Sequence, residues 1–139
     1  MRVYLAGGMR SPWRNDVVSY FYNLPDVEFL DPSTHGLTDE AEYTHWDLDA
    51  VKQSDVVFAY LEADNPSGYG MSLELGYAYA LGKTIIFVQD PGHPQSRYFG
   101  MARTVATYLS YGFEYGIQLL LSLYHEEYAY QVLDLQEAG

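Results

Sequence analysis

Residues 56–61 form an unbroken apolar run, Val-Val-Phe-Ala-Tyr-Leu, with an acidic residue on either side. A strand that is apolar at every position is buried on both faces, and such strands are typical of the middle of a parallel sheet. Sequences that alternate strands with helices indicate an α/β sheet covered by helices on both faces. The run therefore predicts that the flanking sequence alternates in this way.

The flanking sequence shows this alternation. Short apolar runs that end in turn-forming residues predict three further strands, at residues 3–6, 27–30 and 84–88. Helical spacing of apolar residues predicts five helices, at residues 15–23, 46–53, 72–81, 98–111 and 116–133. No repeat or linker interrupts the order, so residues 1–139 are expected to form a single α/β domain.

Composition narrows the classes of function. The 139 residues are 48% hydrophobic, which is enough for a core without metals or disulfides. The absence of cysteine excludes a thiolate nucleophile and fits a reducing compartment. A net charge of −12 argues against nucleic acid and against an acidic membrane surface, and it favours a neutral or weakly charged small molecule.

The apolar segments also bear on location. No apolar run approaches the roughly 20 residues that a membrane span needs, and no signal peptide is recognised before the first predicted strand. We therefore expect a cytoplasmic protein.

Two glycine-containing segments follow predicted strands, at residues 6–9 and 64–70. In open α/β sheets, ligands bind at the carboxyl ends of the strands, and glycine lets the backbone approach a ligand closely. Neither segment has the glycine spacing of a dinucleotide fingerprint or the Gly-Lys-Ser/Thr of a phosphate-binding loop. Both are candidate ligand loops, with ordinary tight turns as the alternative.

Two carboxylates are candidates for chemistry. Glu74 is predicted in the first turn of the helix at 72–81, where the helix N-terminus favours its charged form. Asp47 is predicted near the start of the helix at 46–53. Two carboxylates over one sugar can serve as nucleophile and as the acid beside the leaving group. On spacing alone, either residue could instead be a simple helix-end charge.

Four segments together resemble the nucleoside 2-deoxyribosyltransferase family. They are residues 3–8, 46–49, 54–57 and 68–78, they occur in that family's order, and the resemblance spans roughly the first 90 residues. The most specific part is the Gly-x-Gly block at 68–70, followed by Glu-x-Gly-Tyr-Ala at 74–78.

The resemblance implies a flavodoxin-like or Rossmann-like parallel sheet flanked by helices, and transfer of 2-deoxyribose between nucleobases with retention, as in nucleotide salvage. It implies that Glu74 is the nucleophile that forms a covalent deoxyribosyl-glutamate. It also implies that Asp47 lies in the nucleoside pocket and that the Tyr4 hydroxyl lies beside the nucleophile. The partners would be deoxyribonucleosides and free bases, and the mechanism needs no metal or organic cofactor.

The remaining candidates surround these three. Asp64 or Asn65 could fill the role of an acidic residue that handles the base. The predicted substrate-binding residues are Gly7, Gly8, Met9, Trp13, Asp64, Asn65, Ser67, Gly68, Gly70 and Met71. The four histidines show no metal-ligand spacing, so structural or surface roles are expected for His35, His45, His93 and His125.

The resemblance also implies a homo-oligomer with shared active sites. Candidates for the neighbour's contribution are Tyr98, Phe99 and Met101, and the tyrosine-rich stretch 108–130 offers further contact surface. Two alternatives remain. One is a 2'-deoxynucleoside 5'-phosphate N-hydrolase, for which Arg10, Arg14 and the Gly7-Gly8 turn are the local phosphate candidates. The other is a nucleotide-binding module without turnover.

Overall fold

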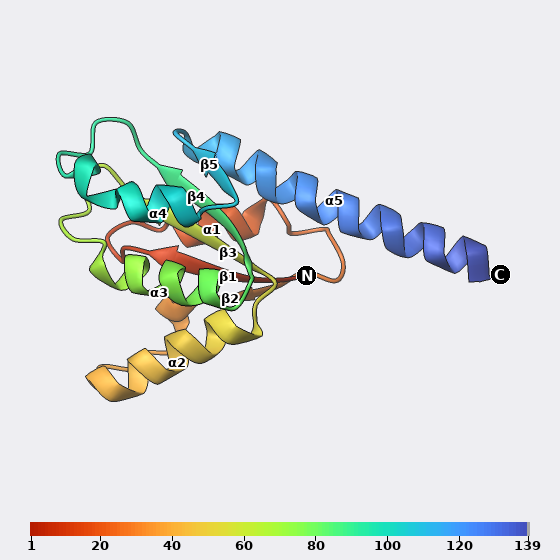
Figure 1. Cartoon of the computed structure of the whole chain (residues 1–139). Helices are drawn as coiled ribbons and strands as arrows, with labels where there is room; N and C mark the ends of the chain where they lie inside the picture. The colour runs from red at the N-terminus through yellow and green to blue at the C-terminus, as the bar shows by residue number, and fades with distance from the viewer. Residues whose placement is uncertain (139) are drawn as a thin grey trace.

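The apolar run at 56–61 forms β3, the middle strand of a five-stranded parallel sheet in the order β2-β1-β3-β4-β5 (Figure 1). The computed structural model describes the backbone of residues 1–138 and the side chains of residues 1–127. The strands are β1 (Arg2–Gly7), β2 (Glu28–Leu30), β3 (Val56–Leu61), β4 (Thr84–Gln89) and β5 (Tyr108–Ser110). This is the flavodoxin-like strand order, whose reversal point lies between β1 and β3.

Helices cover both faces of the sheet, which confirms the predicted fold class. They are α1 (Trp13–Ser19), α2 (Glu40–Gln53), α3 (Tyr69–Ala80), α4 (Gly100–Val105) and α5 (Phe113–Ala138), with short 3-10 turns η1 (Pro32–Thr34) and η2 (Ser96–Phe99). Alternate side chains of each strand point to opposite faces. In β3, Phe58 packs with α1 and α5, whereas Val57 and Ala59 pack with α2, α3 and α4.

Helix α5 lies close against β4 at its first turns. A Cβ on Gly116 would lie 2.3 Å from Cγ2 of Val88, so glycine is required for this approach. Ile117 and Leu120 continue the contact and are completely buried. The C-terminal half of the helix extends beyond the sheet (Figure 1). Among the described residues, no helix combines the length and the apolar character needed to cross a membrane.

The helix predicted at 98–111 is wrong. Residues 96–105 form η2 and α4, and the chain then becomes extended and forms the edge strand β5. The Thr107 N–H donates to the Ile85 carbonyl, and the Ile85 N–H donates to the Thr107 hydroxyl. Because these bonds join residues that are distant in sequence, helical spacing within 98–111 gave no sign of the strand.

Among the helix starts that differ from the prediction, two matter for the site. Helix α2 begins at Glu40, because the Asp39 side chain accepts the Glu42 N–H and caps the helix. Asp47 therefore lies in the middle of α2 and is not an N-terminal charge. Helix α3 begins at Tyr69, so Glu74 lies in its second turn, where the helix dipole favours its charge less.

Substitution of Gly116 tests the contact between α5 and β4. Gly116→Ala should lower the free energy of unfolding by about 1–3 kcal/mol, because the added methyl overpacks the contact with Val88. Gly76→Ala is the matched control, since Gly76 lies within α3 with open space around it. It should raise the free energy of unfolding by about 0.5–1 kcal/mol. Urea unfolding of both variants measures the two effects, and equal changes would contradict the packing argument.

Candidate active site

A cavity of about 180 Å³ opens where β1 and β3 end, beside the first turns of α3. Most of the residues predicted from the sequence line it, together with two that were not among the predicted site residues, Arg14 and Pro32. The predicted residues that line it are Tyr4, Gly7, Gly8, Met9, Asp47, Asn65, Ser67, Gly68, Gly70, Met71 and Glu74. The position agrees with the rule that ligands bind near the reversal of strand order.

Trp13 and Asp64 do not line this cavity, which corrects two predicted substrate contacts. Trp13 is buried in the core, where its ring packs edge-on against Tyr60 at 5.4 Å between centroids. Its indole N–H donates to the Gly8 carbonyl at 3.0 Å, so Trp13 supports the glycine turn from inside the protein. The Asp64 side chain is exposed, and the buried Asn65 reaches the cavity in its place.

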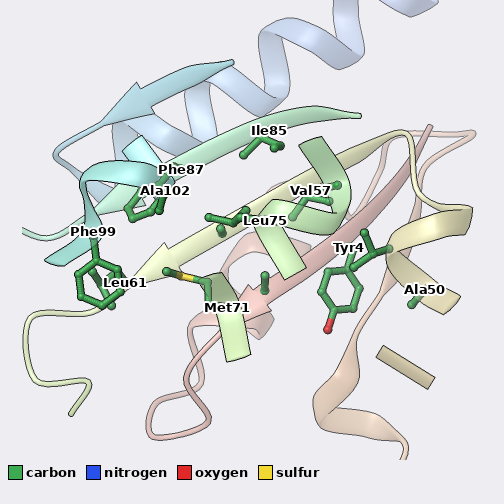
Figure 2. Packing of buried hydrophobic residues seen from close by; sticks show 14 residues of the cluster. Tyr4, Ala50, Val57, Leu61, Met71, Leu75, Ile85, Phe87, Phe99 and Ala102 are labelled. Atoms are coloured by element: carbon green, nitrogen blue, oxygen red, sulfur yellow. The ribbon is translucent and has the colours of Figure 1, made fainter. Parts of the chain in front are cut away.

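Tyr4 and Glu74 form the centre of the site. Tyr4 belongs to β1 and is buried against α3, and its hydroxyl donates a hydrogen bond to Oε2 of Glu74. Figure 2 shows the Tyr4 hydroxyl directed away from the apolar side chains that surround its ring. Burial and the neighbouring Glu74 raise the pKa of Tyr4 further above neutral pH, so the hydroxyl keeps its proton and remains a donor.

The charge of Glu74 is finely balanced. The pKa of Glu74 is raised to about 7, chiefly by burial and in smaller part by the nearby Asp47 carboxylate. The hydrogen bond from Tyr4 and the positive charge of Arg14 act in the opposite direction. Glu74 is therefore a carboxylate that is poorly solvated and yet able to ionise near neutral pH, as a nucleophile requires.

Arg14 is a buried cation beneath the glycine turn. Its guanidinium donates to the carbonyls of Leu5, Gly7 and Gly8 at 3.1, 2.8 and 2.8 Å. Its Nε also lies 3.6 Å from Oδ1 of Asp31. Because backbone carbonyls take these donors, Arg14 fixes the turn and supplies positive charge, whereas the sequence had suggested Arg14 only as a phosphate candidate.

Gly7 itself cannot be replaced without moving the backbone. Its φ is +148°, and a Cβ there would lie 2.5 Å from the carbonyl oxygen of Tyr60 on β3. The requirement for glycine here therefore comes from the close approach of the ends of β1 and β3.

Asp47 faces the same space from α2. It lines the main cavity and also a second cavity of about 90 Å³, whose walls include Tyr43, Leu48 and Leu73. Burial raises the pKa of Asp47, and a hydrogen bond from His35 opposes the increase by stabilising the carboxylate. His35 was expected to be structural or on the surface, and no spacing in the sequence links it to Asp47. Among the described residues, no group of three or more acidic or histidine side chains could hold a metal ion.

A family model described as nucleoside 2-deoxyribosyltransferase like matches residues 1–91. The chain belongs to this family. The match confirms the resemblance, and the matched segment contains every residue that lines the main cavity. A comparison with curated protein sequences gave no significant match.

Three solved structures share the fold. A 2-deoxyribosyltransferase from Leishmania mexicana superposes with a TM-score of 0.66 at 22% identity, over 87% of this chain and 97% of that one. A CMP N-glycosidase from Clostridium botulinum gives 0.59 at 24% identity, over 89% and 99%. A 2-deoxyribosyltransferase from Bacillus psychrosaccharolyticus gives 0.60 at 19% identity, over 82% and 88%.

The raised pKa of Glu74 predicts a pH-dependent effect on stability. Between the ordinary glutamate pKa of 4.5 and the folded value of about 7, the folded state binds more protons than the unfolded state. The free energy of unfolding therefore falls as the pH rises through this range. Glu74→Gln does not titrate and therefore does not lose stability in this way. The free energy of unfolding of the variant minus that of wild type should increase from pH 5 to pH 8, by about 1.4 kcal/mol for each unit by which the Glu74 pKa is raised.

Thermal unfolding at a series of pH values measures this difference. Glu126→Gln is the control, because Glu126 is exposed on α5 and should show little change in relative stability with pH. A constant difference between Glu74→Gln and wild type would mean that Glu74 titrates as an ordinary surface carboxylate.

Proposed function

We propose that the protein transfers 2-deoxyribose between nucleobases, with Glu74 as the nucleophile. The observation that carries the proposal is the buried Glu74 carboxylate, hydrogen-bonded to Tyr4, in the wall of a cavity that a second carboxylate also lines. Family membership supports the same activity. Burial of a carboxylate is costly, so a buried carboxylate with a perturbed pKa in a cavity is a candidate functional group.

In the first half of the reaction, a Glu74 oxygen attacks C1' from the face opposite the base. The electron pair of the C1'–N bond passes to the departing base, which accepts a proton from Asp47. The transition state resembles an oxocarbenium ion, and the surrounding carboxylates stabilise its positive charge. The product of this half is a deoxyribosyl ester on Glu74.

In the second half, an acceptor base enters the position that the first base has left. Its nitrogen loses a proton to Asp47 and attacks C1', and Glu74 leaves as a carboxylate. Two inversions at C1' give net retention. Tyr4 remains a hydrogen-bond donor throughout, so it orients Glu74 and stabilises the carboxylate whenever that group is free.

Hydrolysis of a nucleoside 5'-phosphate is the nearest alternative, because the Clostridium botulinum CMP N-glycosidase shares the fold. A phosphate would need cations at the cavity. Backbone carbonyls engage the Arg14 guanidinium, and Arg10 is exposed with its Nη1 3.4 Å from the Asp64 carbonyl. This arrangement favours an uncharged nucleoside over a nucleotide.

Incubation with deoxyinosine and adenine tests the proposal. We expect deoxyadenosine and hypoxanthine from the wild-type protein. Glu74→Gln should reduce exchange by at least about 1000-fold, because the amide cannot form the ester. Glu62→Gln is the matched control, since Glu62 is equally buried but lies outside the main cavity, and it should retain most of the activity.

The products separate the alternatives. Free hypoxanthine without deoxyadenosine would replace the transferase with a hydrolase, and the absence of both would replace it with a binding module. Near-normal exchange in Glu74→Gln would remove Glu74 from the mechanism.

We also propose that a neighbouring subunit completes the site. The cavity of about 180 Å³ is smaller than the roughly 300 Å³ of most ligand sites, so one subunit alone would leave much of a nucleoside exposed. Leu73, Tyr98 and Met101 expose apolar surface on α3, η2 and α4, and Leu73 lines the smaller cavity next to Glu74. Of the three predicted contributors, Tyr98 and Met101 are exposed, whereas Phe99 is buried in the core. In the predicted stretch 108–130, Tyr128 and Tyr130 lie outside the described side chains.

Sedimentation of two variants tests this surface. Met101→Glu places a charge on the apolar surface and should shift the protein toward the monomer and lower exchange activity. Tyr22→Glu is the control, because Tyr22 is equally exposed, at 85%, on the segment after α1. A wild-type protein that sediments as a fully active monomer would contradict the proposal.

A further inference from the structure

His35 lies against Asp47 in an orientation that its hydrogen bonds fix. Its Nδ1 accepts the Leu37 N–H at 3.0 Å, and its Nε2 lies 3.1 Å from Oδ1 of Asp47. A ring nitrogen that accepts a hydrogen bond carries no proton in the neutral ring, so the hydrogen is on Nε2 and is donated to Asp47. The neutral tautomer is therefore set by the backbone of residue 37.

The position of the ring is also fixed. Trp46 contacts it edge-on, with 4.7 Å between ring centroids and an interplanar angle of 63°. His35 directly follows η1, whose first turn is capped by Asp31 through the Ser33 N–H and hydroxyl. These contacts hold the Nε2–H of His35 at Oδ1 of Asp47.

We propose that His35 is a positioning residue that directs the proton of Asp47 toward the departing base. Since His35 occupies Oδ1, the acidic proton of Asp47 resides on Oδ2. When Oδ2 gives this proton to the base nitrogen, the His35 N–H stabilises the carboxylate that forms. The inference rests on the proposed function, because it assumes that Asp47 protonates the base.

His35 does not carry the proton itself. A relay would need a free lone pair on Nδ1, and the Leu37 N–H occupies that position. The proton therefore moves only between Asp47 and the base, and it returns to Asp47 when an acceptor base loses its N–H proton. The charged groups that act on Asp47 besides His35 are Arg14 and Glu74, and neither donates a hydrogen bond to it among the described residues.

The inference predicts that the effect of His35 depends on the leaving group. Adenine needs a proton to depart as a neutral base. An N7-methylated guanine already carries positive charge in the nucleoside and departs neutral without a proton. Loss of the His35 hydrogen bond should slow only the first class of substrate, whereas damage to the cavity as a whole would slow both.

His35→Phe removes the donor and keeps a ring beside Trp46. We expect release of adenine from deoxyadenosine in a single turnover to slow about 10- to 100-fold, the usual effect of losing a hydrogen bond to a charged group. We expect release of N7-methylguanine from N7-methyl-2'-deoxyguanosine in a single turnover to stay within about threefold of wild type, because this half of the reaction does not use the Asp47 proton. His35→Gln supplies an amide N–H in place of Nε2–H. It should recover at least about half of the decrease in the logarithm of the rate that His35→Phe causes with deoxyadenosine.

Two further variants complete the test. Asp47→Asn should show the same substrate selectivity with a larger loss of about 100- to 10,000-fold, and adding His35→Phe to it should cause little further loss. His45→Phe is the control, because His45 is exposed on the same helix as Asp47 and should behave as wild type with both substrates.

Release of the methylated base also shows that each variant is folded, because this step needs Glu74 but not the Asp47 proton. If the wild-type protein transfers deoxyribose from neither substrate, the proposed function fails. If it transfers from both, then equal slowing of both substrates by His35→Phe, or slowing of neither, overturns the role of His35. Failure of His35→Gln to improve on His35→Phe overturns it as well.

Discussion

Glu74 places a carboxylate in a position that is nine-tenths buried, and a charge in such surroundings is costly unless polar groups compensate it. Tyr4 supplies the hydrogen bond and Arg14 supplies the opposing charge. Arg14 is in turn held by the carbonyls of Gly7 and Gly8. The groups that stabilise the Glu74 carboxylate therefore connect α3 with β1 and with the turn that follows β1.

The compensation is incomplete, and this suits the proposed chemistry. A carboxylate that is fully stabilised by hydrogen bonds and cations has a low pKa and reacts weakly with carbon. Burial raises the basicity of Glu74, while Tyr4 and Arg14 still allow it to ionise near neutral pH. Asp47 has a different environment, since it is less buried and has the His35 N–H as its partner. Two carboxylates with unlike surroundings can take the unlike roles of nucleophile and acid.

The sequence predicted the features that depend on local pattern and missed those that depend on distant partners. The apolar run of β3 and the glycine-flanked Glu74 were visible because each is a pattern within a few residues. The edge strand β5 has only three residues and exists through its pairing with β4. Trp13 was predicted as a substrate-binding residue, but its place in the core is decided by contacts with Tyr60 and Phe113.

The same reasoning explains the errors in the site. Asp47 is an exception: it was predicted near a helix start, although the true start of α2 is marked by a local pair, Asp39 and Glu42. Arg14 binds backbone carbonyls, which carry no residue identity that a pattern could reveal. His35 meets Asp47 because η1 and the turn after it bring residue 35 to the middle of α2, and no periodicity encodes that geometry.

The contacts of Tyr4 determine the stage of folding at which the site forms. Tyr4 is in register with Leu30 of β2 and Val57 of β3, and its hydroxyl partner is 70 residues away in the chain. The reactive carboxylate therefore acquires its environment only after the central strands have assembled, and a partly folded chain would carry an ordinary, solvated Glu74. Opening of the outer helix α5 need not disturb this pair, whereas any opening that frees β1 must. The proposed reactivity at the sugar therefore depends on the paired central strands, and it should be lost only when those strands separate.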